Sequence, residues 1–363
     1  FVGQKQGDAS TTDLREASIK ETVEKACEIA KVMADDPCNG LPDKGLMATN
    51  LYDLQLSKPH AITPADALDL AKACEEHALA LDKRITRSDG VSFSTNEGRS
   101  WYANSHGFIG ETTHTNFDLS CVLIAEKAGK LERDYDFDHH LDFTQLRRPE
   151  DIAEKAVEHT VSRLDSRKVK TQTAPVLFKA DIAVGFLSQF FKAIAGSNLY
   201  RKSSFLLDTL GQSIFPSFID IVERPHILGG HASTLFDADG VQTYDKSFIE
   251  KGVLQTYMLG EYSSRRLGLK TTANADGAHN VLVSHSDKSF HDLVQDMDTG
   301  LIVTEVMGQG VNIVTGDYSR GARGFWVEGG KIQYPVSEIT IAGNLKDLFK
   351  HIVAIGNDID RRY

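Results

Sequence analysis

The sequence predicts an α+β protein with mostly antiparallel sheets, in which N-terminal helices and an antiparallel meander precede a β-rich C-terminal domain with one buried helix. Residues 12–34 and 63–82 show the apolar spacing of helices, and residues 90–137 form a series of strand-like runs. After residue 174 the chain consists largely of further strand-like runs around one apolar helix. The 363 residues are too many for one ordinary domain, so we expect two.

Two helices are expected before the meander. In the first, apolar side chains recur at helical spacing between residues 19 and 33. In the second, Thr63 is the expected N-cap, Pro64 takes the first helical position and Asp66 stands three residues after the cap. The capping residues therefore predict where this second helix begins.

The meander is predicted from strand-like runs separated by the turn-like segments NEG, HG and AGK. Residues 148–166 return to helical spacing, and residues 168–174 have the composition of a linker. We place the boundary there. The N-terminal domain then covers residues 1–167, with its start truncated, and the C-terminal domain covers residues 175–363, without its last strands.

The second half is expected to open with a strand over residues 174–181 and a helix capped by Asp181. This helix is apolar along one side, at Ile182, Phe186, Phe190 and Ile194, which indicates a buried packing element. The segment EGGK (328–331) separates two strand-like runs and predicts a hairpin. A short helix that ends at Gly356 is expected near the C-terminus.

Composition narrows the possible partners. A net charge of −11 and a pI of about 5.6 describe a surface that repels phosphate backbones, so we expect no nucleic-acid partner. The four cysteines are scattered without a CxxC pair, which is typical of a reducing compartment. No apolar run approaches the roughly 20 residues that span a bilayer. We therefore expect a cytoplasmic protein without a membrane partner.

The helix before the segment GSNLYRK lies where an enzyme could carry zinc ligands. A zinc peptidase helix needs imidazole ligands and a carboxylate that activates water. Residues 181–205 contain no His, Cys or Glu, and Asp181 is their one acid. By its composition this helix cannot ligate a metal.

Several long motifs carry a family resemblance. They are LYRKSSFLLDTLGQ (199–212), TGDYSRGARGFWVEGG (315–330), IQYPVSEITIAGNLKD (332–347) and AIGNDID (354–360), with DKRITRSDGVSF and NSHGF in the first half. Together they resemble the PmbA/TldE branch of the TldD/PmbA family, whose older name is modulator of DNA gyrase. The resemblance implies a cytoplasmic protease of a TldD and a PmbA (TldE) subunit that processes peptides, including microcin maturation and antitoxin degradation.

The resemblance also locates the missing chemistry. The TldD subunit carries a His-Glu-x-x-x-His helix and a further Cys ligand. Counted back from the shared pair Arg201–Lys202, that pattern falls on residues 188–193, so Ser188, Gln189 and Ala193 replace two ligands and the base. The Cys ligand would lie beyond residue 360, and family members are longer at the N-terminus. The resemblance thus implies that this chain has no catalytic residue, metal or cofactor and is inactive on its own. It also implies that zinc is bound by a TldD-type partner.

Other polar constellations are candidate sites. In RDYDFDHH, Asp134, Asp136 and Asp138 share one strand face before His139 and His140, which suits a solvated edge strand or a metal site. A second possible metal site, around a Gly-Gly turn, holds His226 and His231. The remaining candidates are peptide-groove or subunit-contact residues: Arg201, Lys202, Asp317, Tyr318, Arg320 and Arg323. For Arg201 and Lys202, a solvated basic pair at a helix end is an equal alternative.

Three functions follow. The first is the non-catalytic subunit of a TldD/TldE metallopeptidase that acts on unfolded peptides, heterodimeric with a TldD-type subunit and homodimeric alone. The second is an independent metal-dependent hydrolase around His226, His231 and the cluster at 134–140. The third is a gyrase-binding regulator, which only the older family name supports. Metal analysis of the purified chain separates the first two.

Overall fold

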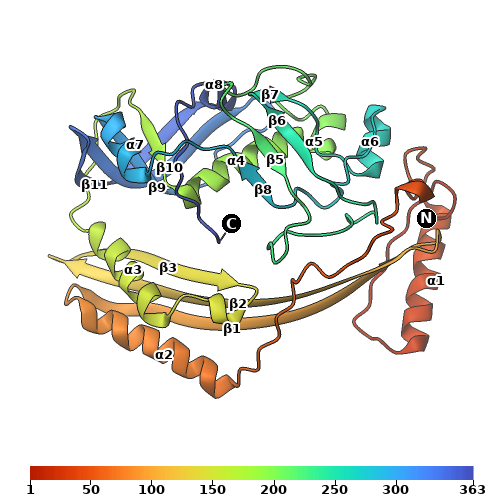
Figure 1. Ribbon diagram of the computed structural model, residues 1–363, viewed down its shortest axis with the longest axis horizontal. Coiled ribbons are helices and arrows are strands. Elements are labelled where there is room, and N and C mark those ends of the chain that lie inside the picture. Colours follow the sequence, from red (N-terminus) through yellow and green to blue (C-terminus); the bar gives the residue numbers. More distant parts are fainter. Residues whose placement is uncertain (363) are drawn as a thin grey trace.

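The computed structural model describes residues 1–362 and has the expected α+β architecture (Figure 1). The helices are α1 (Glu16–Val32), α2 (Pro64–Leu81), α3 (Pro149–Ser162), α4 (Ala180–Ile194), α5 (Gly196–Tyr200), α6 (Glu261–Leu267), α7 (Phe290–Met297) and α8 (Leu345–Lys350). The strands are β1 (Ile85–Ala103), β2 (Ile109–Lys127), β3 (Lys130–His140), β4 (Val176–Phe178), β5 (Ile221–Glu223), β6 (Lys246–Glu250), β7 (Val253–Leu254), β8 (Val281–Val283), β9 (Gly300–Met307), β10 (Asp317–Glu328) and β11 (Lys331–Asn344).

The first half is built on the antiparallel sheet β1-β2-β3, which carries α2 and α3 on one face (Figure 1). Thr63 and Asp66 form the expected capping box at the start of α2, each side chain bonding the other residue's main chain. The core between helices and sheet includes Cys74 of α2, Ile152 of α3 and Leu123 of β2, all fully buried. This half therefore has a hydrophobic core of its own.

One expected turn is not a turn. The segment NEG lies inside β1, where Asn96 pairs with Asn116 and Gly98 with His114. Turn-forming residues are outweighed here by the long neighbouring strand, which supplies main-chain partners along the whole of β1. The curved β1–β2 hairpin consequently extends from the sheet toward α1 (Figure 1).

The second half contains two four-stranded sheets, ordered β11-β10-β9-β4 and β7-β6-β5-β8. All their strand pairs are antiparallel except β4 with β9. The predicted EGGK hairpin joins β10 to β11, and its two glycines have φ of 59° and 67°. Those values suit a tight hairpin turn that glycine adopts without strain.

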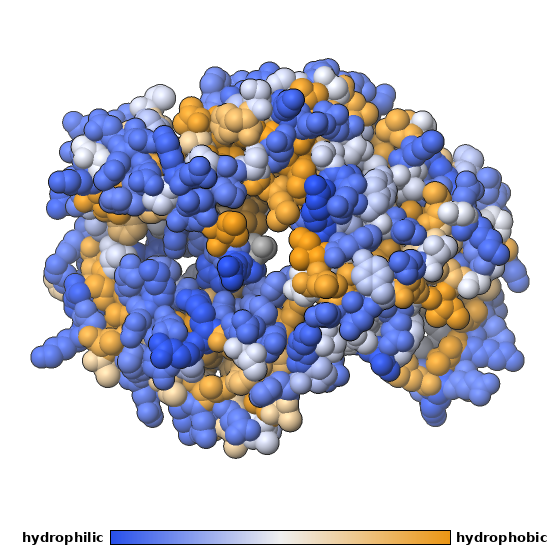
Figure 2. All heavy atoms as spheres, in the orientation of Figure 1, coloured by the Kyte–Doolittle hydropathy of each residue, from blue (hydrophilic) through white to orange (hydrophobic). Residues whose placement is uncertain are grey.

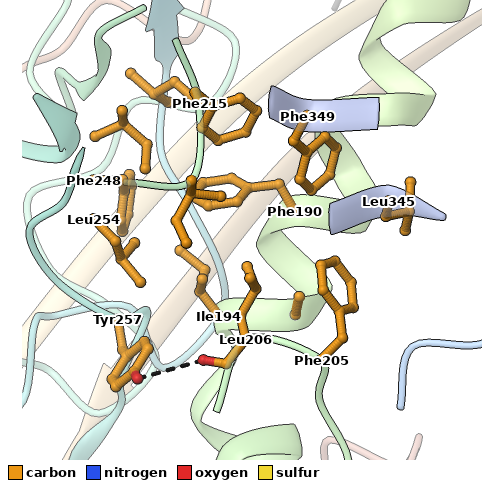
Figure 3. Packing of buried hydrophobic residues seen from close by; sticks show 14 of the residues in the cluster. Phe190, Ile194, Phe205, Leu206, Phe215, Phe248, Leu254, Tyr257, Leu345 and Phe349 are labelled. Atoms are coloured by element: carbon orange, nitrogen blue, oxygen red, sulfur yellow. Dashed lines mark hydrogen bonds between the residues drawn. The ribbon is translucent and has the colours of Figure 1, made fainter. Parts of the chain in front are cut away.

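Helix α4 lies in the main core of the second half, as its apolar spacing predicts. Phe190 and Ile194 are fully buried, and Phe190 packs edge-on against Phe215, with ring centroids 5.3 Å apart. Phe349 of α8 packs against Phe215 with its ring tilted, and their ring centroids are 4.9 Å apart (Figure 3). An aromatic cluster thus joins α4 to α8 and to the loop that precedes β5.

Three expected helix ends differ in the structure. Helix α4 begins at Ala180, so Asp181 lies inside its first turn and does not cap it. Its break falls at Ala195, and Gly196 starts α5 instead. A Cβ at this position would lie 2.3 Å from the hydroxyl of Ser263, which explains why the residue is glycine. Helix α8 ends at Lys350, well before Gly356. Among residues 1–362, no helix has both the length and the apolar character needed to cross a membrane.

Candidate functional site

The three motif positions on α4 are used for packing and for bonds within the helix. Ser188 Oγ donates to the carbonyl of Val184 at 2.9 Å, and Gln189 Nε2 donates to that of Gly185 at 3.4 Å. Ala193 is fully buried in the main core. The polar side chains at these positions are thus satisfied by their own helix turn.

These residues do not fit zinc. Zinc in proteins takes thiolate, imidazole and carboxylate ligands, whereas these three positions hold a hydroxyl, an amide and a methyl group. Within the described part of the chain, no group of three or more His, Cys, Asp or Glu side chains is arranged to hold a metal ion. No catalytic step through a metal is therefore derived for α4.

The acidic row on β3 is not a solvated edge. Asp134 and Asp136 are 9% and 3% exposed, because they lie opposite Leu123 and Cys121 on the face of the sheet that α2 and α3 cover. Asp134 pairs with Arg163, which also binds Glu305 of β9 at 2.7 Å. Asp136 pairs with Arg147 at 2.8 Å. Burial beside arginines, rather than hydration, explains these carboxylates.

The same junction contains Arg323 of β10. Its guanidinium lies 3.6 Å from Glu132 of β3 and 3.9 Å from Glu305. Arg163, Arg323, Glu132, Asp134 and Glu305 thus form a cluster, here called the junction cluster, that ties the first half to the second. Charges of both signs alternate across it, so each carboxylate has a cationic neighbour, and the pair of Asp134 with Arg163 is buried.

The other loop candidates do not gather into one groove. Asp317 accepts hydrogen bonds from Thr315 and Asn344, and Arg320 Nε donates to the carbonyl of Met307 at 3.1 Å. Tyr318 is 5% exposed and lies in the main core.

Arg201 lies over the ring of Tyr200, 5.4 Å from its centroid, and Lys202 has a φ of 57°. Both side chains are exposed. Peptide or subunit contact by these residues and by the loop candidates stays a prediction.

The two histidines of the Gly-Gly turn have different surroundings. The Nε2 atom of His226 is 2.9 Å from the hydroxyl of Thr243. His231 instead meets His139 and His140 of β3 edge-on, with ring centroids 4.9 and 5.6 Å apart. Burial, together with these two imidazoles, lowers the pKa of His231 below its ordinary value. The three rings thus pack together where β3 meets the second half.

A buried ionic cluster in the second half was not predicted. Glu223, fully buried at the end of β5, pairs with Lys246 of β6. Its Oε1 also accepts hydrogen bonds from Asn274 Nδ2 at 2.8 Å and from the main-chain N–H of His279 at 2.6 Å. The His279 ring is 3.2 Å from Asp276. These residues are named the Glu223 cluster below.

Electrostatics in the Glu223 cluster favour the charged forms. Burial alone would raise the pKa of Glu223, but its bond to His279 and the charge of Lys246 outweigh burial and lower it. Burial would likewise lower the pKa of His279, yet hydrogen bonds to Asp276 and Glu223 raise it to about 9. No motif links these residues in the sequence, since they come from three separate segments.

An open pocket of about 490 Å³ adjoins this cluster. It is lined by Arg224, His226, Ile227, Gln242, Thr243, Tyr244, Asp245 and Leu282. Arg224 and Asp245 pair across it at 3.4 Å, so its charges are balanced. The half-exposed side chains of Tyr244 and Leu282 give it an apolar wall.

This scaffold is that of a metallopeptidase family. Residues 57–164 match the PmbA/TldA metallopeptidase central domain, and residues 171–363 match the C-terminal domain of the same family. The chain therefore belongs to the PmbA/TldD family, as the sequence motifs indicate. The three-stranded sheet with its two helices lies inside the first match, and α4 and the Glu223 cluster lie inside the second.

Individual relatives agree with this assignment. Metalloprotease PmbA of Escherichia coli O157:H7 is 47% identical over 358 residues, 99% of this chain and 80% of the relative. A PmbA homolog of Haemophilus influenzae is 47% identical over the whole chain and 80% of its own length.

Solved structures share the fold. A candidate modulator of DNA gyrase from Bacteroides thetaiotaomicron superposes with a TM-score of 0.95 at 29% identity, over 100% of this chain and 83% of that one. TldE of Thermococcus kodakarensis gives a TM-score of 0.83 at 21% identity, over 98% and 82%. At that identity, the likeness to TldE concerns the fold alone.

Proposed function

We propose that this chain is the non-catalytic, PmbA/TldE-type subunit of a TldD/TldE metallopeptidase that acts on unfolded peptides. The observation that supports the proposal is on α4, where Ser188, Gln189 and a fully buried Ala193 stand at the positions to which the resemblance assigns the ligands and the base. The helix keeps its place in a metallopeptidase scaffold, but its side chains serve the core.

A catalytic partner is part of the proposal. A TldD-type subunit would contribute the zinc ion and its ligands, and this chain would form part of the wall that encloses the peptide. Without that partner the chain would form homodimers. The family membership and the 47% identity with metalloprotease PmbA support the assignment to this branch of the family.

An independent metal-dependent hydrolase lacks a specific observation in its favour. His226 and His231 have different partners, and in the part of the chain that the structure describes the contact of His231 with the two histidines of β3 is not arranged to hold a metal ion. The gyrase-regulator function is favoured by no feature of this chain. It remains a description given to the structural neighbour from Bacteroides thetaiotaomicron.

Co-purification tests the proposed subunit role. The tagged chain is co-expressed with a TldD-type subunit from the same organism, and the eluate is assayed for cleavage of an unfolded peptide. We expect a stable pair whose cleavage activity is abolished by a chelator, and no cleavage by this chain alone. A chain that elutes alone, or that cleaves the peptide without its partner, would overturn the proposal.

A further inference from the structure

Strand β8 forms one edge of its sheet. Its register against β5 is fixed by two flanking hydrogen bonds: Arg224 N–H donates to the carbonyl of Asn280 at 3.1 Å, and Ser284 N–H donates to that of Asp220 at 2.9 Å. Along an antiparallel pair, the main-chain N–H and C=O groups of successive residues point alternately toward the partner strand and away from it. Residues 280, 282 and 284 therefore direct their main-chain groups toward β5.

The main-chain groups of Val281 and Val283 therefore point away from the sheet. Among residues 1–362 no strand pairs with this side of β8, and no hydrogen bond to these main-chain groups is formed. Unpaired donors and acceptors along a sheet edge are a ready template for another extended chain.

Both ends of this edge are fixed. The Asn280 side chain donates to the carbonyl of Arg224 at 3.0 Å and to the Ser233 hydroxyl at 2.6 Å. At the other end, the Ser284 hydroxyl accepts from the main chain of Asp220 at 2.8 Å and donates to Phe218 at 2.9 Å. An edge that is already ordered loses little conformational entropy when a second strand binds.

The surroundings of the edge suit an extended chain with apolar side chains. Leu282 projects from β8 into the pocket of about 490 Å³, whose wall also holds Ile227 and Tyr244. Arg224 and Asp245 neutralise each other at the rim. Figure 1 shows β8 on the side of the second half that faces the sheet β1-β2-β3, and Figure 2 shows apolar side chains around a hollow in this part of the molecule.

We propose that the outer edge of β8 binds an extended peptide, which adds a strand beside Val281 and Val283 and places an uncharged apolar side chain in the pocket beside Leu282. This inference rests on the proposed function and deepens it by placing part of the substrate path on this chain. Recognition through main-chain groups is largely independent of sequence, whereas the pocket adds a preference for apolar residues over charged ones.

Proline at position 283 tests the edge directly. It removes the outward N–H while the bonds to β5 stay in place, and edge positions tolerate proline. Val283→Ala is the matched control, because both variants lose the valine side chain from the core and only proline loses the N–H.

Binding of a short fluorescein-labelled peptide, rich in Gly, Ser and Thr around one central Leu, is measured by fluorescence anisotropy. We expect Val283→Pro to bind the peptide about tenfold more weakly than Val283→Ala. The proline variant loses the hydrogen bond from the main-chain N–H of residue 283 to the peptide and weakens the adjacent main-chain bonds. Replacing the central Leu with Asp should also weaken binding to the unchanged chain. Equal affinities for the two variants, or no saturable binding up to about 1 mM, overturn the proposal.

A second probe covers the case in which the proline variant fails to fold. The same peptide, N-methylated at alternate residues, cannot donate main-chain bonds along one side. It should bind the unchanged chain about tenfold more weakly than the parent peptide, and equal binding contradicts strand addition. Co-purification of Val283→Pro with the TldD-type subunit separates the two proposals: a pair that still forms, with unaltered peptide affinity, rejects the β8 site and retains the subunit role.

Discussion

Replacing Lys246 with methionine should strongly destabilise the second half of the protein. Lys246 is the cation that pairs with Glu223, and their side chains are 6% and 0% exposed. Methionine fills a similar volume but leaves the carboxylate of Glu223 buried without its main counter-charge. Removing one partner of a buried ion pair typically costs about 3–5 kcal/mol, and we expect a loss in this range.

The structure also sets the size of the recovery in a double variant. Glu223 Oε1 accepts from Asn274 and from the main chain of His279, and a glutamine carbonyl at the same place keeps both bonds. Glu223→Gln combined with Lys246→Met removes both charges of the pair. We expect this double variant to lose only about 1–2 kcal/mol, less than the single Lys246→Met variant.

Urea unfolding followed by tryptophan fluorescence measures both values. A Trp101→Phe background leaves Trp326 of β10, which is 6% exposed, as the reporter of the second half. Lys288→Met is the control, since its pair with Asp296 is about half exposed and should contribute little to stability. A double variant as unstable as Lys246→Met would refute the reasoning, because the loss would then come from packing and not from an unpaired charge.

Three further predictions concern the metal motif and pH. Installing the motif with Ser188→His, Gln189→Glu and Ala193→His should give no chelator-sensitive cleavage in peptide assays. Melting curves should show a protein less stable by about 1–3 kcal/mol, because residue 193 is fully buried. Elemental analysis of the unaltered chain should find no stoichiometric zinc. The pKa of His279 is raised from about 6.5 to about 9, so this residue stabilises the fold most below pH 6.5. Up to roughly 3 kcal/mol of this stabilisation is lost as the pH rises through 9. Urea titrations at several pH values should show that this pH dependence of the unfolding free energy is absent in His279→Gln. His231 has a lowered pKa, so its effect on stability has the opposite pH dependence. Its contribution to the unfolding free energy is present above pH 6.5 and is lost in acid. Proteolysis between the two halves should therefore accelerate below about pH 6 unless His231 is replaced by Phe.

Features that depend on neighbouring residues could be predicted from the sequence. The capping box at Thr63 and the hairpin at residues 328–331 each involve fewer than five residues, and both are present. The burial of α4 follows from its own apolar spacing. The sequence motifs also predict the family, because they are long and lie throughout the chain.

Features that depend on residues far apart in the chain could not be predicted from the sequence. Asp134 looks like a surface residue in its own strand, and its burial depends on Arg163 and on Glu305, which is 171 positions later in the chain. Glu223, Lys246 and His279 are each unremarkable in sequence, and only the fold assembles them. The prediction of a turn at the segment NEG was wrong for the same reason, because the pairing of β1 with β2 decides whether these residues form a turn.

The degenerate helix and the proposed peptide edge share one core. Val281 and Val283 turn their side chains toward the cluster that contains Phe190, Ala193 and Ile194 of α4. In a metallopeptidase the helix must leave room for a metal and its ligands, whereas here a fully buried alanine lets neighbouring groups close on it, and the Ser204 hydroxyl donates to its carbonyl at 2.6 Å. Packing α4 tightly makes the support beneath β8 rigid, and a rigid edge binds an extended chain at lower entropic cost. On this reasoning, the proposed loss of metal ligands and the proposed peptide-binding edge of β8 would both follow from the same packing.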